Sequence, residues 1–289
     1  MTAVDTEVIV DTLLAWAERE HRDLPWRVTR DPWAILVSET MLQQTQVDRV
    51  VPKYLAFLER FPDPSTCAAA PPAEVVTQWA GLGYNRRAVN LHRAAVQIVD
   101  QHADIVPSDL DALLALPGVG PYTARAVLVF AYERDIGVVD TNVGRLLARL
   151  GGRSLGPKQA QTLADHLVPT GRSWAWNQGL FDLGAAVCTK RSPRCGECPV
   201  IAACAWAGQG PDPAEGSAAT TQRQSRFDGS FRQGRGRLVA ALRDRPVAVD
   251  EVAAVVEWDD PIAVERCIAG LVADGLVEIR GDAVVLAGG

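Results

Sequence analysis

The chain has 289 residues, of which 48% are hydrophobic, and its formal net charge is −6. This composition suits one large helical body plus a smaller module, and the lack of both an apolar run long enough for a membrane span and a signal-peptide pattern predicts a cytoplasmic protein. The acidic charge argues mildly against a nucleic-acid partner, but seven arginines against two aspartates make residues 222–245 locally basic.

The first two-thirds of the chain has a helical pattern. From Val8 to about Leu183, apolar residues recur at three- and four-residue spacing and are interrupted by proline and glycine, with little sustained alternation. This periodicity predicts an all-α domain over residues 1–206.

A helix-hairpin-helix is predicted within this domain. Ser108 can cap a helix over residues 110–116, and Pro121 suits the first position of a helix over residues 122–132. The turn between these helices consists of Pro117, Gly118, Val119 and Gly120. Backbone N–H groups of its last three residues can bind a DNA phosphate at the start of the second helix, which needs little side-chain charge.

The C-terminal part of the chain has a different pattern. Residues 207–228 are mostly small, polar and rich in proline and glycine, which predicts a linker. Residues 229–289 predict a small winged-helix-like α+β module, with helices over 234–242, 249–256 and 262–273 and two strands joined at Gly281 and Asp282. Winged helices bind DNA or partner proteins, and both roles stay open.

Four cysteines are crowded into one loop over residues 188–204, with the spacing Cys188-x6-Cys195-x2-Cys198-x5-Cys204. In a reducing compartment such spacing predicts metal ligation rather than disulfides. An iron-sulfur cluster suits a loop that wraps a compact inorganic centre, although zinc also takes four sulfurs and spacing alone does not choose between them. Cys67 and Cys267 lie apart and fit ordinary buried cysteines.

Several motifs together resemble a known family. The cysteine spacing, LPGVGPYTARA at 116–126 and the aspartate of VVDTNVGRL at 138–146 resemble the helix-hairpin-helix iron-sulfur DNA glycosylases. SETMLQQTQVDRV at 38–50 and GLGYNRRAVNLH at 81–92 resemble the MutY-type adenine glycosylases within that superfamily. The resemblance covers about residues 15–206. It implies a two-lobed fold, one 4Fe-4S cluster per chain held by the four cysteines, and repair of double-stranded DNA.

The reaction that the resemblance implies is hydrolysis of the N-glycosidic bond of adenine mispaired with 8-oxoguanine or guanine. Such a site needs an acid for the leaving base and an anion for the cationic sugar, and two carboxyl groups in different environments can supply them. Glu39 lies in the apolar run AILVSETML, and by resemblance it protonates adenine at N7. Asp140 by resemblance stabilises or captures the sugar cation, and it can also cap a helix over residues 143–150.

A tyrosine predicts that the DNA strand is left intact. Relatives that also cleave the strand use a lysine amine in the helix-hairpin-helix motif to form a Schiff base, and here that position is Tyr122. We therefore expect a monofunctional, monomeric glycosylase without β-lyase activity. By resemblance, Tyr122 and Asn142 support the aspartate and the transition state.

Other residues are candidates for handling the extruded base. Gln43 and Gln44 can hydrogen-bond base edges, and Tyr84 can wedge beside the base that stays in the stack. Arg27 and Asp182 match family positions near the adenine pocket.

The opposite-base preference is the point at which the resemblance ends. Typical MutY-type proteins continue into a C-terminal domain that reads 8-oxoguanine, whereas the C-terminal residues here are too few for it and fit a winged helix. Two alternatives stay open. One is a thymine or uracil mismatch glycosylase on the same scaffold, and the other is a non-catalytic iron-sulfur protein that binds DNA or senses redox state. We also expect association with the bacterial nucleoid.

Overall fold

The computed structural model describes residues 3–217 and 226–289, without side-chain detail for residues 3–6. They form two compact units. The unit that carries Asp140 consists of Met1–Pro32 and Gly120–Arg223, and the unit that carries Glu39 consists of Trp33–Val119 and Gln224–Gly289. We call them the Asp140 unit and the Glu39 unit. In the described ranges, no helix is both long and apolar enough to cross a membrane.

The predicted boundaries at residues 206 and 229 follow the change in sequence pattern rather than these units, and they stay a prediction. Part of the predicted linker and one arginine of the basic stretch, Arg223, lie outside the described residues.

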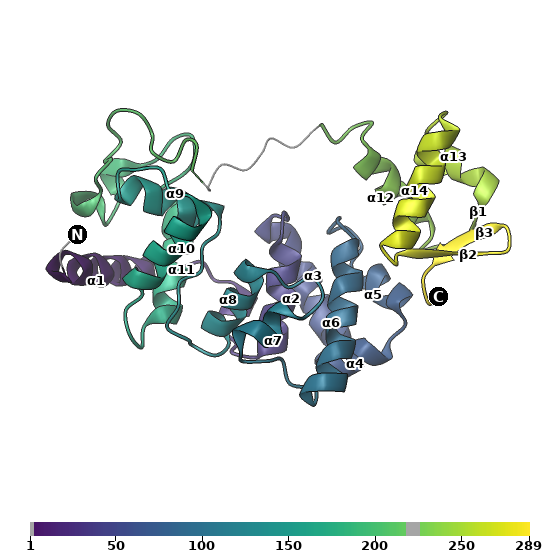
Figure 1. The fold of residues 1–289 in the computed structure, drawn as a ribbon, viewed down its shortest axis with the longest axis horizontal. Helices are drawn as coiled ribbons and strands as arrows, with labels where there is room; N and C mark the ends of the chain where they lie inside the picture. The colour runs from purple at the N-terminus through teal and green to yellow at the C-terminus, as the bar shows by residue number, and fades with distance from the viewer. Residues whose placement is uncertain (1–2, 218–225) are drawn as a thin grey trace. The chain divides into compact units, whose positions relative to one another are not determined.

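The Asp140 unit is helical (Figure 1). Its α-helices are α1 (Ala3–Glu20), α8 (Pro121–Phe130), α9 (Thr141–Leu150), α10 (Pro157–Leu167) and α11 (Ser173–Ala186). Short 3-10 turns cover Pro25–Arg27, Cys195–Glu197 and Ile201–Ala203, the last two within the predicted cysteine loop.

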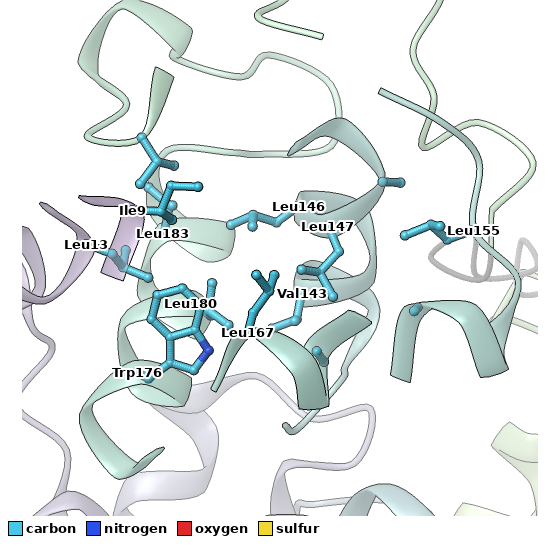
Figure 2. Packing of buried hydrophobic residues seen from close by; sticks show 14 of the residues in the cluster. Ile9, Leu13, Val143, Leu146, Leu147, Leu155, Leu167, Trp176, Leu180 and Leu183 are labelled. Carbon is cyan, nitrogen blue, oxygen red and sulfur yellow. The ribbon is translucent and has the colours of Figure 1, made fainter. Parts of the chain in front are cut away.

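The core of the Asp140 unit joins helices that are far apart in the sequence. Figure 2 shows Ile9 and Leu13 of α1 beside Leu183 of α11, with Leu147 of α9 in the same buried cluster. Each fully buried aliphatic side chain of this kind contributes about 1.5–3 kcal/mol relative to an exposed one. This packing gives α9, the helix that begins beside Asp140, a rigid support.

The Glu39 unit begins with six helices. They are α2 (Pro32–Leu42), α3 (Val47–Arg60), α4 (Pro64–Ala69), α5 (Pro72–Gln78), α6 (Arg86–His102) and α7 (Leu110–Leu114). Aromatic rings pack in their core: the Phe57 ring lies 4.9 Å from that of Phe61 and 6.0 Å from that of Trp79. The Trp33 indole N–H donates to the Phe61 carbonyl at 3.0 Å, which fixes the start of α2 against the end of α3.

The C-terminal segment of the same unit contains helices followed by a small sheet. Its elements are α12 (Phe231–Ala241), β1 (Val247–Ala248), a 3-10 turn (Val249–Glu251), α13 (Val252–Val256), α14 (Pro261–Ala273), β2 (Val277–Arg280) and β3 (Ala283–Leu286). The sheet is antiparallel in the order β1-β3-β2. The two predicted strands are confirmed, and Gly281 takes the left-handed conformation, with φ +61°, in the turn between them. Strand β1 was not predicted, because a strand of two residues is too short to show the alternation of apolar and polar residues that marks a strand.

The helix-hairpin-helix is confirmed, with one correction. Helix α7 is capped by Asp109, whose carboxylate accepts from the Ala112 N–H at 3.0 Å, rather than by Ser108 as predicted. A carboxylate one residue nearer to the helix satisfies its first N–H groups better than the more distant hydroxyl. In the turn, Gly118 has φ +79°, and a Cβ there would lie 2.7 Å from that of Asn90, so both backbone and space require glycine.

Candidate active site

Glu39 lies in the most buried helix of its unit. Helix α2 buries every residue from Trp33 to Met41, and Glu39 is only 4% exposed. The neighbouring hydroxyls of Ser38 and Thr40 donate to carbonyl groups of their own helix, at 2.8 and 2.7 Å. Glutamate is rarely buried to this extent, so Glu39 stays a candidate for the acid that the sequence predicts.

Two turns of the Glu39 unit present the candidate base-handling residues. Gln43 and Gln44 follow the end of α2, and Gln44 has a left-handed backbone with φ +58°. Tyr84 has φ +47° and follows Gly83 at φ +71°, so its turn is also left-handed. Such conformations are uncommon in residues other than glycine and concentrate at functional sites.

The side chain that joins these two turns is Arg87, which the sequence argument did not single out. Its guanidinium is buried and donates to main-chain carbonyls on both sides. The acceptors are Thr40, Met41 and Gln43 at 2.7, 2.9 and 2.7 Å, and Leu82 and Gly83 at 3.2 and 3.0 Å. Burial lowers the pKa of Arg87 to about 10, so it stays charged at neutral pH. The only available sequence signal was an arginine in an amphipathic helix.

A small cavity brings one of these turns next to the hairpin. Gln43, Arg87, Gly118 and Val119 all line it. Three of the predicted DNA-contacting residues, Gln43, Gly118 and Val119, therefore lie around this cavity of the Glu39 unit. Gly120 is the first residue of the second segment of the Asp140 unit and is the N-cap residue of α8.

Asp140 is held in place by three N–H donors. It is the N-cap of α9, and its Oδ1 accepts from the Asn142 and Val143 backbone N–H groups at 2.8 and 2.7 Å. Its Oδ2 accepts from the Asn142 side-chain amide at 2.9 Å. The predicted capping role is thus present. Hydrogen bonds from three donors fix the orientation of this carboxylate.

Tyr122 is the second residue of α8, in the same unit as Asp140, and it is half-buried. The preceding Pro121 occupies the first helical position, as predicted. The structure thus joins Asn142 directly to Asp140 and places Tyr122 in the first turn of a neighbouring helix of the unit.

Arg27 and Asp182 bind each other. The Arg27 guanidinium makes two bonds to the Asp182 carboxylate, at 2.7 and 2.9 Å, and both side chains are buried. Arg22 adds a third bond at 2.6 Å. This bidentate pair ties the chain after α1 to α11, and contact with adenine stays a prediction.

Two arginines of α9 join Asp140 to the cysteine loop. Arg145 donates to the Asn142 side-chain oxygen at 3.0 Å and to the Cys188 carbonyl at 2.8 Å. One turn later, Arg149 donates to the Cys188 Sγ at 3.4 Å and forms a buried ion pair with Asp212 at 2.6 Å. A single helix thus has the candidate catalytic carboxylate at its start and the cysteine loop along its side.

The four cysteines of the loop line one cavity, together with Arg149 and Trp206. Burial raises the pKa of the Cys198 thiol to about 11 and also raises that of Cys188. Four thiolates there would need a bound cation, so the donor set fits a thiolate-ligated metal centre. Within the described ranges, no group of three or more His, Cys, Asp or Glu side chains is arranged to hold a metal ion. Cys67 and Cys267 are buried and free, as predicted.

Comparisons with known proteins identify the family of this chain. The model of the HhH-GPD superfamily of base excision DNA repair proteins matches residues 37–170. The chain is 46% identical over 276 residues to an adenine DNA glycosylase of Mycolicibacterium smegmatis, covering 93% of this chain and 92% of that protein. Human adenine DNA glycosylase is 39% identical over 67% of this chain and 38% of its own length.

A solved structure extends the comparison to the fold. A thermostable thymine-DNA glycosylase matches with a TM-score of 0.67 and 32% identity, covering 71% of this chain and 97% of that one. Its chain is thus almost wholly matched. This chain therefore belongs to the HhH-GPD superfamily of base excision DNA repair proteins, among the adenine DNA glycosylases.

Proposed function

We propose that this protein is a monofunctional adenine DNA glycosylase of base excision repair, which hydrolyses the N-glycosidic bond of adenine mispaired with 8-oxoguanine or guanine in double-stranded DNA. The observation that carries the proposal is the Asp140 carboxylate, fixed by three N–H donors at the start of α9. The names and identities of the relatives support adenine as the base.

Glu39 and Asp140 have complementary chemical roles in this proposal. Glu39 donates its proton to N7 of adenine, which makes the neutral base a good leaving group as the bond to the sugar breaks. Burial disfavours a charged carboxyl group, and this suits an acid. Asp140 stabilises the positive charge on the sugar, and water then adds to the sugar carbon and gives up a proton, which returns the Glu39 carboxylate to its acid form. Tyr122 and Asn142 support Asp140, and the absence of a lysine at position 122 supports the lack of β-lyase activity.

Base extrusion is assigned to the Glu39 unit. Gln43 and Gln44 hydrogen-bond base edges near the lesion, and Tyr84 fills the gap that the extruded adenine leaves. Gly118, Val119 and Gly120 bind a phosphate through backbone N–H groups. Arg27 and Asp182 support the base-binding region as an ion pair. The shared anchoring of the two turns by Arg87 supports the assignment, since residues that act together on one base pair need a fixed spacing.

The cysteine loop is assigned to one 4Fe-4S cluster, with Cys188, Cys195, Cys198 and Cys204 as ligands. When bound, the cluster would supply positive iron centres that crosslink the loop into a rigid DNA-contacting element. The Cys198→Ser variant tests this: iron content and DNA affinity should fall, whereas zinc in the purified wild type would overturn the cluster assignment.

An excision panel tests the proposed function. Duplexes with A:8-oxoguanine, A:G and T:G pairs are incubated with excess enzyme, and the abasic product is measured after alkaline cleavage. We expect adenine release from the first two duplexes and no strand cleavage before alkali. Release of thymine alone would replace the proposal with a mismatch thymine glycosylase. DNA binding without any excision would favour the non-catalytic alternative.

Two further expectations have their own tests. Light scattering of the purified protein tests the expected monomer. Imaging of the labelled protein in cells tests the expected association with the nucleoid.

A further inference from the structure

The C-terminal segment is fastened to the turn that carries Tyr84. Within the Glu39 unit, Arg243 donates to the Val76 carbonyl at 3.3 Å and to the Asn85 side chain at 3.4 Å. Arg86, at the start of α6, forms an ion pair with Asp274 at 3.3 Å. These contacts hold the chain just after α12 and the end of α14 against α5 and the start of α6, next to the Tyr84 turn.

An arginine of this segment reaches Tyr84 itself. Arg232 donates from its Nη1 to the Tyr84 hydroxyl at 3.0 Å, and its guanidinium lies 5.9 Å from the centre of the Phe227 ring. Tyr84 is 41% exposed and Phe227 is 55% exposed. We call Tyr84, Phe227 and Arg232 the aromatic-arginine cluster.

The helix below the cluster is rigidly built. Trp258 packs so closely over α12 that a Cβ at Gly234 would lie 2.3 Å from its ring, and it stacks on Phe231 with ring centres 5.3 Å apart. The Ser230 hydroxyl caps α12 by accepting from the Gln233 N–H at 3.3 Å. Arg232 is therefore presented from a fixed backbone, which lowers the entropy lost when it binds a ligand.

The chemistry of the cluster fits an unpaired nucleotide. An exposed aromatic face stacks on a base of any sequence, and a guanidinium binds phosphate or stacks on a base plane. A surface that only fastened the segment would bury its aromatic rings, whereas Tyr84 and Phe227 keep large exposed areas. The location also matters, since the cluster includes the residue assigned to fill the gap in the opened duplex.

We infer that the C-terminal segment is part of the DNA-reading surface: Phe227 and Arg232 bind the duplex where Tyr84 enters it, with the ring on an exposed base and the guanidinium on a phosphate. The inference rests on the proposed function. It assigns the C-terminal segment to DNA rather than to a protein partner.

Three single variants and one control test this inference in the full chain. Phe227→Ala removes the exposed ring, Arg232→Gln removes the charge, and Tyr84→Phe removes only the hydroxyl that holds Arg232. The control is Arg280→Gln, an exposed arginine on β2 whose ion pair is with Glu278. Affinity for an A:8-oxoguanine duplex is measured by fluorescence anisotropy at several salt concentrations, and melting temperature checks the fold.

We expect Phe227→Ala and Arg232→Gln each to weaken binding on the order of 5- to 50-fold, as loss of one stacked base or phosphate contact does. Arg232→Gln should also reduce the slope of log affinity against log salt by about 1, which a structural role would not do. Tyr84→Phe should weaken binding less, and Arg280→Gln should not change it.

Wild-type affinity in both Phe227→Ala and Arg232→Gln, or equal losses in Arg280→Gln, would overturn the inference. Excision by the wild type is measured separately at saturating enzyme. If the wild type released no adenine, the proposed function would fail, whereas adenine release with unchanged binding by the variants would refute only the role of the cluster.

Discussion

Glu39 and Asp140 occupy opposite kinds of environment in their two units. Glu39 lies within an eleven-residue helix in which every neighbour from Trp33 to Met41 is buried. Asp140 lies at a helix start, partly exposed, where three N–H groups surround its carboxylate. The first carboxyl group lies within a buried helix, and the second accepts hydrogen bonds from three N–H donors.

This contrast matches the two roles that we propose for these carboxyl groups, with Glu39 as the acid and Asp140 as the anion. Two of the variants below alter Glu39 or Asp140 directly. The other two remove a buried charge or a helix cap elsewhere in the Glu39 unit, for comparison.

Glu39→Gln should cause the largest loss. Glutamine keeps the size of the side chain but cannot supply the proton, so we expect single-turnover adenine release to fall on the order of 10³- to 10⁴-fold with DNA affinity retained. Ser38→Ala is the matched control, because that hydroxyl bonds only to its own helix at Ile35. A rate within a few fold of wild type for Glu39→Gln would show that burial here serves packing rather than acid catalysis.

Asp140→Asn separates charge from capping. Asparagine caps helices as well as aspartate does, so the melting temperature should change little, while adenine release should fall on the order of 10²- to 10³-fold because the anion is lost. Asp140→Ala should additionally cost about 1 kcal/mol of stability. Unchanged excision by Asp140→Asn would remove this residue from the mechanism.

Arg87→Ala tests how far the Glu39 unit depends on one buried cation. Truncation leaves carbonyl groups on two turns without their donor, so we expect a loss of about 2–4 kcal/mol in the free energy of unfolding, measured with urea, and weaker DNA binding. The neighbouring Arg86→Ala removes one ion pair of an exposed guanidinium, that with Asp274, and should cost less than about 1 kcal/mol. Equal effects of the two variants would contradict the anchoring role of Arg87.

Asp63→Ala removes a helix cap of the same kind as Asp140, but in the Glu39 unit, where Asp63 is the N-cap of α4. The Thr66 backbone N–H donates to this carboxylate at 2.8 Å and is the main cause that holds its pKa below the ordinary 3.8. Its stabilising effect is therefore present above about pH 4 and is lost as the pH falls through the lowered pKa. Urea unfolding should show a loss of about 1 kcal/mol at pH 7, smaller near pH 3, and no change in excision rate. A slower reaction would show that capping alone influences catalysis.

The fold could be predicted where the pattern is local. The hairpin turn, the strands around Gly281 and the α9 cap at Asp140 all follow from residues adjacent in the sequence. The cap of α7 was misplaced by one residue because Ser108 and Asp109 are both good capping residues.

The contacts that join distant residues could not be predicted. The sequence shows that Arg87 is an arginine on a helix, but its five carbonyl acceptors lie on turns that only the tertiary fold brings together. The contact between Arg232 and Tyr84 likewise joins residues 148 positions apart. Such pairs carry no sequence period, so local reasoning cannot find them.

The Asp140 unit is built from two segments that are far apart in the chain, and this has a consequence for protein synthesis. Helix α1 is synthesised before α11, the helix on which it packs, and α11 begins about 150 residues later. At a synthesis rate of roughly 5–20 residues per second, the apolar side chains of Ile9, Val10 and Leu13 lack their packing partners on α11 for on the order of 10–30 s. During that interval the nascent chain exposes an apolar stripe that a chaperone can bind, so the yield of this unit should depend on translation speed and chaperone supply.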